Sequence, residues 1–178
     1  MAKRNFPLSE VYTLLEPGPV VLLTTIRGDK PDVMTMSWLT MMEFTPPQIG
    51  CVISNRNYSF KALQETGECV INIPTAELAQ AVVGCGNTSG RHIDKFSRFG
   101  LTPEAGKRVR APLIKECFAS LECQVVNTDL VAAYCFFVLE VCKAWRDAKL
   151  KNEPTLHHRG WGTFVLDGET ITLPSKML

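Results

Sequence analysis

The chain has 178 residues, of which 46% are hydrophobic and 21% charged, as is usual for a water-soluble protein. This length suits a single domain over residues 1–178 with a sizeable buried core. The formal net charge of +1 gives no support to nucleic-acid binding, which needs a clustered basic face. The densest basic stretch, residues 107–110, is too short to form one and indicates a solvated loop.

The chain carries no sequence signal for export or for a membrane span. Lys3, Arg4 and Glu10 interrupt the N-terminal segment, which therefore lacks the apolar core of a signal peptide. The longest apolar run, residues 130–139, is far shorter than the roughly 20 residues that a spanning helix needs. We therefore expect a cytoplasmic protein that makes no membrane contact.

Apolar periodicity and turn-forming residues predict many strands and a few short helices, which indicates a β-barrel or sandwich. Gly67 and Gly100 are placed to end two of the helices. In the first part of the chain, we expect a helix over 8–15, strands over 20–26 and 32–37 joined by a turn at 28–31, a loop around 34–39, and a strand over 49–53 after Pro46-Pro47. A helix over 59–65, a strand over 69–73, a helix capped by Thr75 that runs to 83, a flexible loop over 84–90 and a helical turn over 93–99 should follow. The last expected elements are strands near 117–126, 131–144 and 162–172, the last with a turn at 167–168.

The polar segment Ser54-Asn55-Arg56-Asn57-Tyr58-Ser59 leaves an apolar strand and opens a helix. The first N–H groups of a helix lack intrahelical partners and favour an anion. Arg56 adds a two-pronged donor, and Ser54 and Ser59 add hydroxyl groups, so the segment predicts a phosphate cradle. An ordinary helix cap beside a solvent-exposed arginine is the alternative.

The segment Thr35-Met36-Ser37-Trp38 combines a strand end with bulky apolar side chains. A flat heterocyclic ring needs an apolar slot with backbone donors and acceptors along its polar edge. The backbone of Thr35, Met36 and Ser37 can present that edge, while Met36 and Trp38 flank the ring. The alternative is that Trp38 and the methionines only pack the core.

Other patterns give weaker signals. The glycines at 84, 86 and 90 are spaced one residue too wide for a dinucleotide-binding loop, and they follow a predicted helix instead of a strand. Adjacent His157 and His158 would point to opposite faces of an extended segment, which disfavours a shared metal. The polar loop from Thr88 to His92 could close over an anionic ligand or simply lie at the surface.

The seven cysteines form no CxxC pair, which predicts free thiols instead of a disulfide framework or a structural zinc site. Most lie among apolar neighbours and should be buried. Cys85 is the exception of interest, because glycines flank it.

Taken in order, these segments resemble the flavin reductase-like, FMN-binding split-barrel family, and its flavoredoxin branch in particular. The resemblance implies a mainly β protein with short helices, folded as an FMN-binding split β-barrel. It extends from Pro17 to about Gly168, and beyond the segments above it rests on residues 66–74, Ser89-Gly90-Arg91 with Asp94-Lys95-Phe96, Pro112-Leu113, and residues 119–123.

The resemblance also implies binding roles for ten residues, with no catalytic side chain and no metal. Thr35, Met36, Ser37 and Trp38 would line the isoalloxazine ring; Ser54, Arg56, Asn57 and Ser59 would hold the phosphate and ribityl chain; Lys95 would approach the flavin from its loop, and Phe164 from the C-terminal strands.

The function that the resemblance implies is an FMN-dependent oxidoreductase. NAD(P)H would reduce bound FMN, which would pass electrons to a flavin, a ferric ion or a protein acceptor. Family members are usually homodimers with the flavin close to the subunit interface, so we expect a homodimer. A non-enzymatic FMN electron carrier reduced by a partner protein is the second hypothesis, and a small β-barrel without flavin is the third.

Two positions depart from the family pattern. The family often has an asparagine where this chain has Asp32, and a carboxylate there would repel a phosphate or a reduced, anionic flavin. An Asp-His pair often stands where this chain has Ala133-Tyr134. Tyr134 can stack on a flavin but cannot replace a histidine as an acid near neutral pH. Both departures bear on the electron donor and acceptor.

Overall fold

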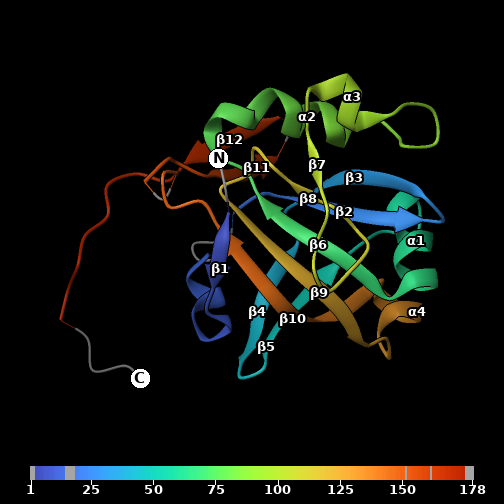
Figure 1. Cartoon of the computed structure of the whole chain (residues 1–178), viewed down its shortest axis with the longest axis horizontal. Helices are drawn as coiled ribbons and strands as arrows, with labels where there is room; N and C mark the ends of the chain where they lie inside the picture. The colour runs from blue at the N-terminus through green and yellow to red at the C-terminus, as the bar shows by residue number, and fades with distance from the viewer. Residues whose placement is uncertain (1–2, 15–18, 151, 161, 175–178) are drawn as a thin grey trace.

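The structure is a computed structural model that describes residues 3–14, 19–150, 152–160 and 162–174 (Figure 1). Its main feature is one antiparallel sheet with the strand order β3-β2-β6-β9-β10-β5-β4, to which β1 adds by pairing with β10. The strands of this sheet are β1 (Arg4–Phe6), β2 (Val21–Arg27), β3 (Lys30–Met36), β4 (Leu39–Phe44), β5 (Pro47–Val52), β6 (Glu68–Ile73), β9 (Ala119–Asn127) and β10 (Phe136–Arg146).

Short helices and two small strand pairs surround this sheet. In Figure 1, α2 and α3 lie together at one end of the molecule, above β3, whereas α1 and α4 lie at the side. The helices are the 3-10 helices η1 (Leu8–Leu14) and η2 (Ala76–Leu78) and the α-helices α1 (Tyr58–Thr66), α2 (Ala79–Asn87), α3 (Lys95–Phe99) and α4 (Val131–Tyr134). The small pairs are β7 (Pro103–Glu104) with β8 (Leu113–Ile114), and β11 (Leu156–Gly160) with β12 (Thr163–Leu166).

One face of the large sheet encloses a single core. Met34 on β3 and Ile49 on β5 lie near opposite ends of the strand order, yet both belong to the cluster that also holds Ile71, Leu121 and Leu139. Since alternate side chains of a strand share one face, the sheet must curve to bring these residues together. The result is a barrel in which no hydrogen-bonded ladder joins the edge strands β3 and β4 among the described residues.

A second core covers the outer face of β2 and β3. Val20, Leu22 and Val33 pack against Val82 of α2 and Phe96 of α3. The run that forms β2 is apolar without alternation because both of its faces are buried. This packing places α2 and α3 beside the C-terminal half of β3, where the candidate site lies.

Most of the predicted elements are confirmed. The hairpin of β2 and β3 forms with the expected antiparallel pairing, and α1 ends at Gly67, which has a φ of 66°. The expected mainly β barrel with short helices is observed. The helix predicted over 8–15 is the 3-10 helix η1, and residue 15 lies outside the described residues. No helix among the described residues is long and apolar enough to cross a membrane.

The prediction of a loop over 84–90 is wrong for its first half, since α2 continues to Asn87. A Cβ atom at residue 84 would lie 2.3 Å from the ring of Phe99, so Gly84 allows α3 to pack directly on α2. This tertiary contact outweighs the low helix propensity of glycine. The helix predicted from Thr75 to residue 83 also begins differently from the prediction. Thr75 makes no side-chain cap hydrogen bond, and the 3-10 helix η2 lies between it and α2.

Two predictions about strands are wrong in part, and one strand was missed. Strand β4 was not expected, because a register shift between Met41 and Glu43 breaks its apolar alternation. Residues 131–134 form α4 and only then does β10 begin, since an apolar run without periodicity does not distinguish a helix from a strand. Of the strand predicted near 162–172, only the first part is confirmed, as β12; its partner β11 lies before that range, and residues 167–174 have no regular secondary structure.

Candidate functional site

Three hollows in the surface share Thr35, near the C-terminal end of β3. The Thr35 hydroxyl donates a 2.5 Å hydrogen bond to the carbonyl of Val82, which fixes the end of β3 against α2. Because one residue borders all three spaces, a ligand of several parts could extend from one hollow into the next.

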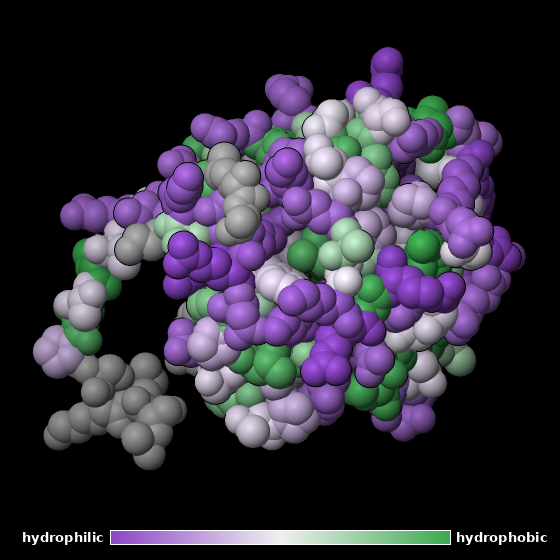
Figure 2. Space-filling view, in the orientation of Figure 1, coloured by the Kyte–Doolittle hydropathy of each residue, from purple (hydrophilic) through white to green (hydrophobic). Residues whose placement is uncertain are grey.

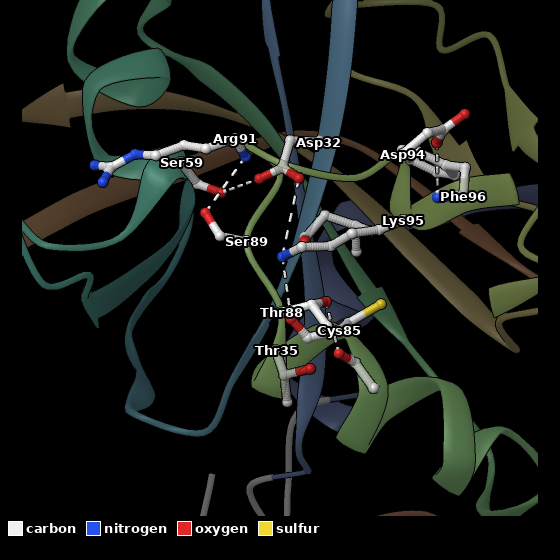
Figure 3. Close-up of polar contacts among 12 residues, drawn as sticks. Asp32, Thr35, Ser59, Cys85, Thr88, Ser89, Arg91, Asp94, Lys95 and Phe96 are labelled. Carbon is white, nitrogen blue, oxygen red and sulfur yellow. Dashed lines mark hydrogen bonds and ion pairs between the residues drawn. The ribbon is translucent and has the colours of Figure 1, made fainter. Parts of the chain in front are cut away.

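The first space, which we call the polar hollow, has a volume of 180 Å³ and lies between β3, the start of α1, and the segment from α2 to α3 (Figure 3). Hydroxyl, carboxylate and cationic groups dominate its lining. Its residues include Asp32, Thr35, Arg56, Asn57, Ser59, Cys85, Thr88, Ser89 and Lys95.

Lys95 is the buried cation of the polar hollow, with a relative exposure of 4%. It is the first residue of α3, whose N-cap Asp94 accepts hydrogen bonds from the N–H groups of Phe96 and Ser97 at 3.0 and 3.3 Å. Its ammonium donates to the carbonyls of Val33 and Cys85 at 2.7 and 3.0 Å. Since an ammonium carries three protons, one N–H remains for an anion in the hollow.

Asp32 is the buried anion of the same hollow. The Ser59 hydroxyl donates to its Oδ2 at 3.1 Å, and the Lys95 ammonium lies 3.9 Å from its Oδ1, an ion pair too long for a hydrogen bond (Figure 3). Burial raises the pKa of the Asp32 carboxyl above its usual range, and Lys95 and Ser59 offset only part of that rise. Gly90 packs closely against the carboxylate, since a Cβ atom added at residue 90 would lie 2.1 Å from Oδ1.

The start of α1 borders both the polar hollow and the space beside it. Asn57 is the N-cap, in an extended conformation, and its side chain makes no cap hydrogen bond. Its N–H donates to the carbonyl of Ser54 at 2.9 Å, which forms the turn that carries Arg56 into solvent. Asn57 lines both of these spaces.

The second space, the strand-end slot, has a volume of 230 Å³. Trp38 on its rim is 71% exposed, so the interpretation of Trp38 as a core residue is wrong. Met36 is different, since its side chain is buried in the barrel core while the residue borders the slot. The slot is lined by Met34, Thr35, Met36, Ser37, Trp38, Val52, Ser54 and Asn57.

The third space, the C-terminal hollow, has a volume of 360 Å³ and lies between β3, α2 and the β11–β12 pair. The rings of His158 and Phe164 face each other there, with centroids 5.3 Å apart and an interplanar angle of 44°. The hollow is lined by Val20, Thr35, Met36, Ser37, Val82, Val83, Gly86, Asn87, His158, Gly162 and Phe164.

All ten residues predicted for the site border these three spaces. Arg56, Ser59 and Lys95 line the polar hollow, whereas Ser54, which was predicted to hold the phosphate and ribityl chain with Arg56 and Ser59, lines the strand-end slot. Phe164 lies in the C-terminal hollow. The three spaces have Thr35 in common among their lining residues, so the predicted set lies around the end of β3.

Sequence reasoning missed several lining residues. His158 was weighed only as a metal ligand, and Asn87 was placed in a loop; no spacing in the sequence relates either residue to β3. Thr88 and Ser89 were noted as part of a polar loop that could meet an anion, and they do line the polar hollow. Among the described residues, no group of three or more His, Cys, Asp or Glu side chains is placed to hold a metal ion.

The cysteines of the structure are free thiols. Cys85 is buried within α2, not exposed in a loop, and it borders the polar hollow. Burial raises the pKa of its thiol to about 11, so the thiol stays protonated and unreactive at neutral pH.

Comparison with known proteins identifies the family of the chain. The model of the Flavin reductase like domain matches residues 14–162. The chain belongs to the flavin reductase-like family. A protein of uncharacterised function from Archaeoglobus fulgidus is 34% identical to this flavin reductase-like protein over 154 residues, which covers 85% of this chain and 87% of the relative.

Two solved structures show the same fold. The FMN-binding domain of a flavin reductases-like enzyme from Shewanella baltica superposes with a TM-score of 0.92 at 24% identity, covering 97% of this chain and 98% of the other. Flavoredoxin from Methanosarcina acetivorans gives a TM-score of 0.76 at 25% identity, covering 89% of each chain. The fold of this flavin reductase-like protein is therefore the split barrel of FMN-binding proteins.

The donor set of the site fits FMN at every position except one. The free N–H of Lys95, the Arg56 guanidinium and the hydroxyl of Ser89 suit a phosphate, whereas the Thr88 hydroxyl already donates to the carbonyl of Gly84 at 2.8 Å. The adjoining strand-end slot has an uncharged lining, which suits a ring. Asp32 does not suit a phosphate, because its carboxylate lines the same hollow. The residues present thus fit the cofactor, with the exception of the Asp32 carboxylate.

Proposed function

We propose that this flavin reductase-like protein binds FMN and passes electrons from NAD(P)H to a flavin, a ferric ion or a protein acceptor. The observation that carries the proposal is the position of Thr35, which borders a polar hollow, an uncharged slot and a third hollow at once. FMN has the same succession of parts, namely a phosphate, a ribityl chain and a flat ring.

The chain's own residues would bind and orient the cofactor. Lys95 and Arg56 would hold the phosphate, and Asn57, which lines both the polar hollow and the strand-end slot, would meet the ribityl chain. The backbone of Ser37 would meet the polar edge of the ring. Bound FMN would supply the redox chemistry, and the protein its placement. The C-terminal hollow beside His158 and Phe164 would admit the nicotinamide or the acceptor.

The test is an absorbance spectrum of the purified protein with FMN, recorded before and after anaerobic addition of NADH or NADPH. The proposal expects a bound flavin spectrum that bleaches on addition of the nicotinamide. A bound flavin that stays oxidised would favour the carrier function instead. A protein that binds no flavin would refute both functions.

A matched pair of arginine variants locates the phosphate. Arg56→Ala should weaken FMN binding by about tenfold, the effect of losing one charge-assisted hydrogen bond, and leave riboflavin binding unchanged. Arg98→Ala is the control, because Arg98 is also exposed and lies on α3 but does not border any of the three spaces. Equal effects of the two variants would contradict the assignment of Arg56.

A non-enzymatic electron carrier is the second candidate function. The exposed side chain of Trp38 favours it, since an aromatic rim beside the flavin suits contact with a protein donor. Tyr134, where the family pattern has histidine, is 69% exposed on α4. In this case a reduced partner protein should reduce the bound flavin much faster than NADH or NADPH does.

We also propose that the protein is a homodimer. Met42 and Phe44 on the edge strand β4 are 50% and 55% exposed, as is Trp38 nearby in the chain. The C-terminal arm, residues 167–174, projects from the body in Figure 2 and carries Ile171 and Leu173, each 70% exposed. Apolar surfaces of this kind mark association sites. Sedimentation equilibrium should give the mass of a dimer, and a monomer mass would contradict the proposal.

A further inference from the structure

The carboxylate of Asp32 lines the hollow that suits a phosphate, and it is held there by the surrounding structure. We propose that phosphate binding in this hollow takes up a proton, which Asp32 and the phosphate share, so that the affinity for FMN falls as the pH rises. This inference rests on the proposed function, because it assumes that the phosphate of a flavin occupies the polar hollow.

The charges around Asp32 do not resolve the conflict by themselves. Lys95 on α3 is the nearest cation, but its ammonium is already bound by two carbonyl groups and must serve both the carboxylate and the phosphate. Arg56 before α1 and Lys30 on the same strand are exposed to solvent, which screens them. Cys85 on α2 is a protonated thiol and adds no charge.

Asp32 cannot turn away from the ligand. Gly90 packs against the carboxylate from the loop before α3, since a Cβ atom there would lie 2.1 Å from Oδ1. Ser59 holds the other oxygen by a hydrogen bond of 3.1 Å. On the neighbouring strand, Thr25 is the register partner of Asp32, and its buried hydroxyl has no hydrogen-bond partner among the described residues. The carboxylate therefore stays in place when a phosphate arrives.

Two anions in a partly buried hollow repel each other, and one proton removes the repulsion. Without the proton, a phosphate dianion would share the hollow with an ionised carboxylate. With it, the carboxyl group and the phosphate can form an O–H···O hydrogen bond to an ionised oxygen, which is a strong type of bond. The proton comes from solvent, so no other reactant is needed. The complex holds one more proton than its separated components.

The experiment is isothermal titration calorimetry of the full chain with FMN at about pH 7.5, in PIPES and in Tris. The dependence of the measured enthalpy on the ionisation enthalpy of the buffer counts the protons taken up, and we expect about one per FMN. The dissociation constant should also rise by up to about tenfold per pH unit above neutrality. Riboflavin, which lacks the phosphate, should bind without proton uptake.

Asp32→Asn keeps the shape of the side chain and removes its charge. This variant should bind FMN at about pH 8 at least about tenfold more tightly than the wild type, the effect of one pKa unit of interaction, and should take up almost no proton. Asp29→Asn is the matched control, because Asp29 lies exposed in the turn between β2 and β3 and does not border the hollow. It makes the same charge change and should keep the wild-type proton uptake.

The outcomes separate this inference from the proposed function. FMN binding without proton uptake in the wild type, or with equal uptake in Asp32→Asn, would overturn the inference and leave FMN binding intact. Failure of the wild type to bind either FMN or riboflavin between about pH 6 and pH 8 would overturn the proposed function itself. The buffer comparison needs only the wild type, so the test stands even if Asp32→Asn fails to fold.

Discussion

Gly90 lies against the carboxylate of Asp32 so closely that a Cβ atom at residue 90 would come within 2.1 Å of Oδ1 and 2.5 Å of Cγ. The two residues belong to different elements, a loop before α3 and the strand β3, and their contact holds the Asp32 carboxylate, which lines the polar hollow. The site thus depends on a glycine that no ligand need touch.

We expect Gly90→Ala to destabilise the protein by about 2 kcal/mol, because Ser59 and Lys95 hold Asp32 where the added methyl group must go. Urea unfolding followed by tryptophan fluorescence measures the change. Gly168→Ala is the control, since no atom lies within 4 Å of its added Cβ, and it should leave the stability unchanged. Equal stability of the two variants would contradict the close packing.

Removal of the buried cation should be more severe. Lys95→Met leaves the Asp32 carboxylate without its ion-pair partner and the carbonyls of Val33 and Cys85 without a donor, so we expect a loss of about 3 kcal/mol. The double variant with Asp32→Asn should recover part of that loss. Lys61→Met, an exposed position on α1, should change the free energy of unfolding little. Additive effects of the Lys95 and Asp32 substitutions would show that the pair is not coupled.

The stability of the ligand-free protein should depend on pH through Asp32. Its pKa is raised in the folded state by burial, so the folded protein binds more protons than the unfolded chain at this group. Its contribution to stability is therefore lost as the pH rises from the unfolded value near 3.8 through the higher folded pKa, and it is constant above that. Urea unfolding between about pH 3 and pH 7 should show Asp32→Asn gaining stability relative to the wild type as pH rises. A constant difference would contradict the raised pKa.

Glu122 is a second buried carboxylate, and its role is structural. It is fully buried on β9, where Oε2 accepts the N–H groups of Lys107, Arg108 and Val109 and Oε1 accepts the indole N–H of Trp145. The basic stretch noted in the sequence is thus a loop wrapped around an anion.

Glu122→Gln would replace one of the two accepting oxygens by an NH₂ group. That group cannot accept a hydrogen bond from the N–H groups that face it. We expect a loss of about 2–4 kcal/mol in the free energy of unfolding. Limited proteolysis should then cut the segment between β7 and β8 faster than in the wild type. Glu169→Gln, exposed in the C-terminal arm, is the control and should change neither quantity.

Local signals in the sequence were sufficient for much of the barrel. The apolar run of β2, the turn at Gly28 and the αL glycine after α1 are each determined by neighbours in the chain, because strand burial, turn geometry and helix capping act over a few residues. The order of these segments was also enough to indicate the family and the predicted site residues. Local signals failed where packing between distant segments bears on the structure, as at Gly84, which continues α2 and leaves the space that the ring of Phe99 occupies.

The sequence by itself determined a mainly β fold, a polar helix start at Arg56 and a strand end at Thr35. Only the tertiary structure decided that these two features border one site, that Ser54 lies with Trp38, and that His158 joins them. The placement of Asp32 between Ser59, Lys95 and Gly90 is likewise a product of folding. The physical reason is that burial, ion pairing and pKa depend on groups brought together through space, for which separations along the chain carry no signal.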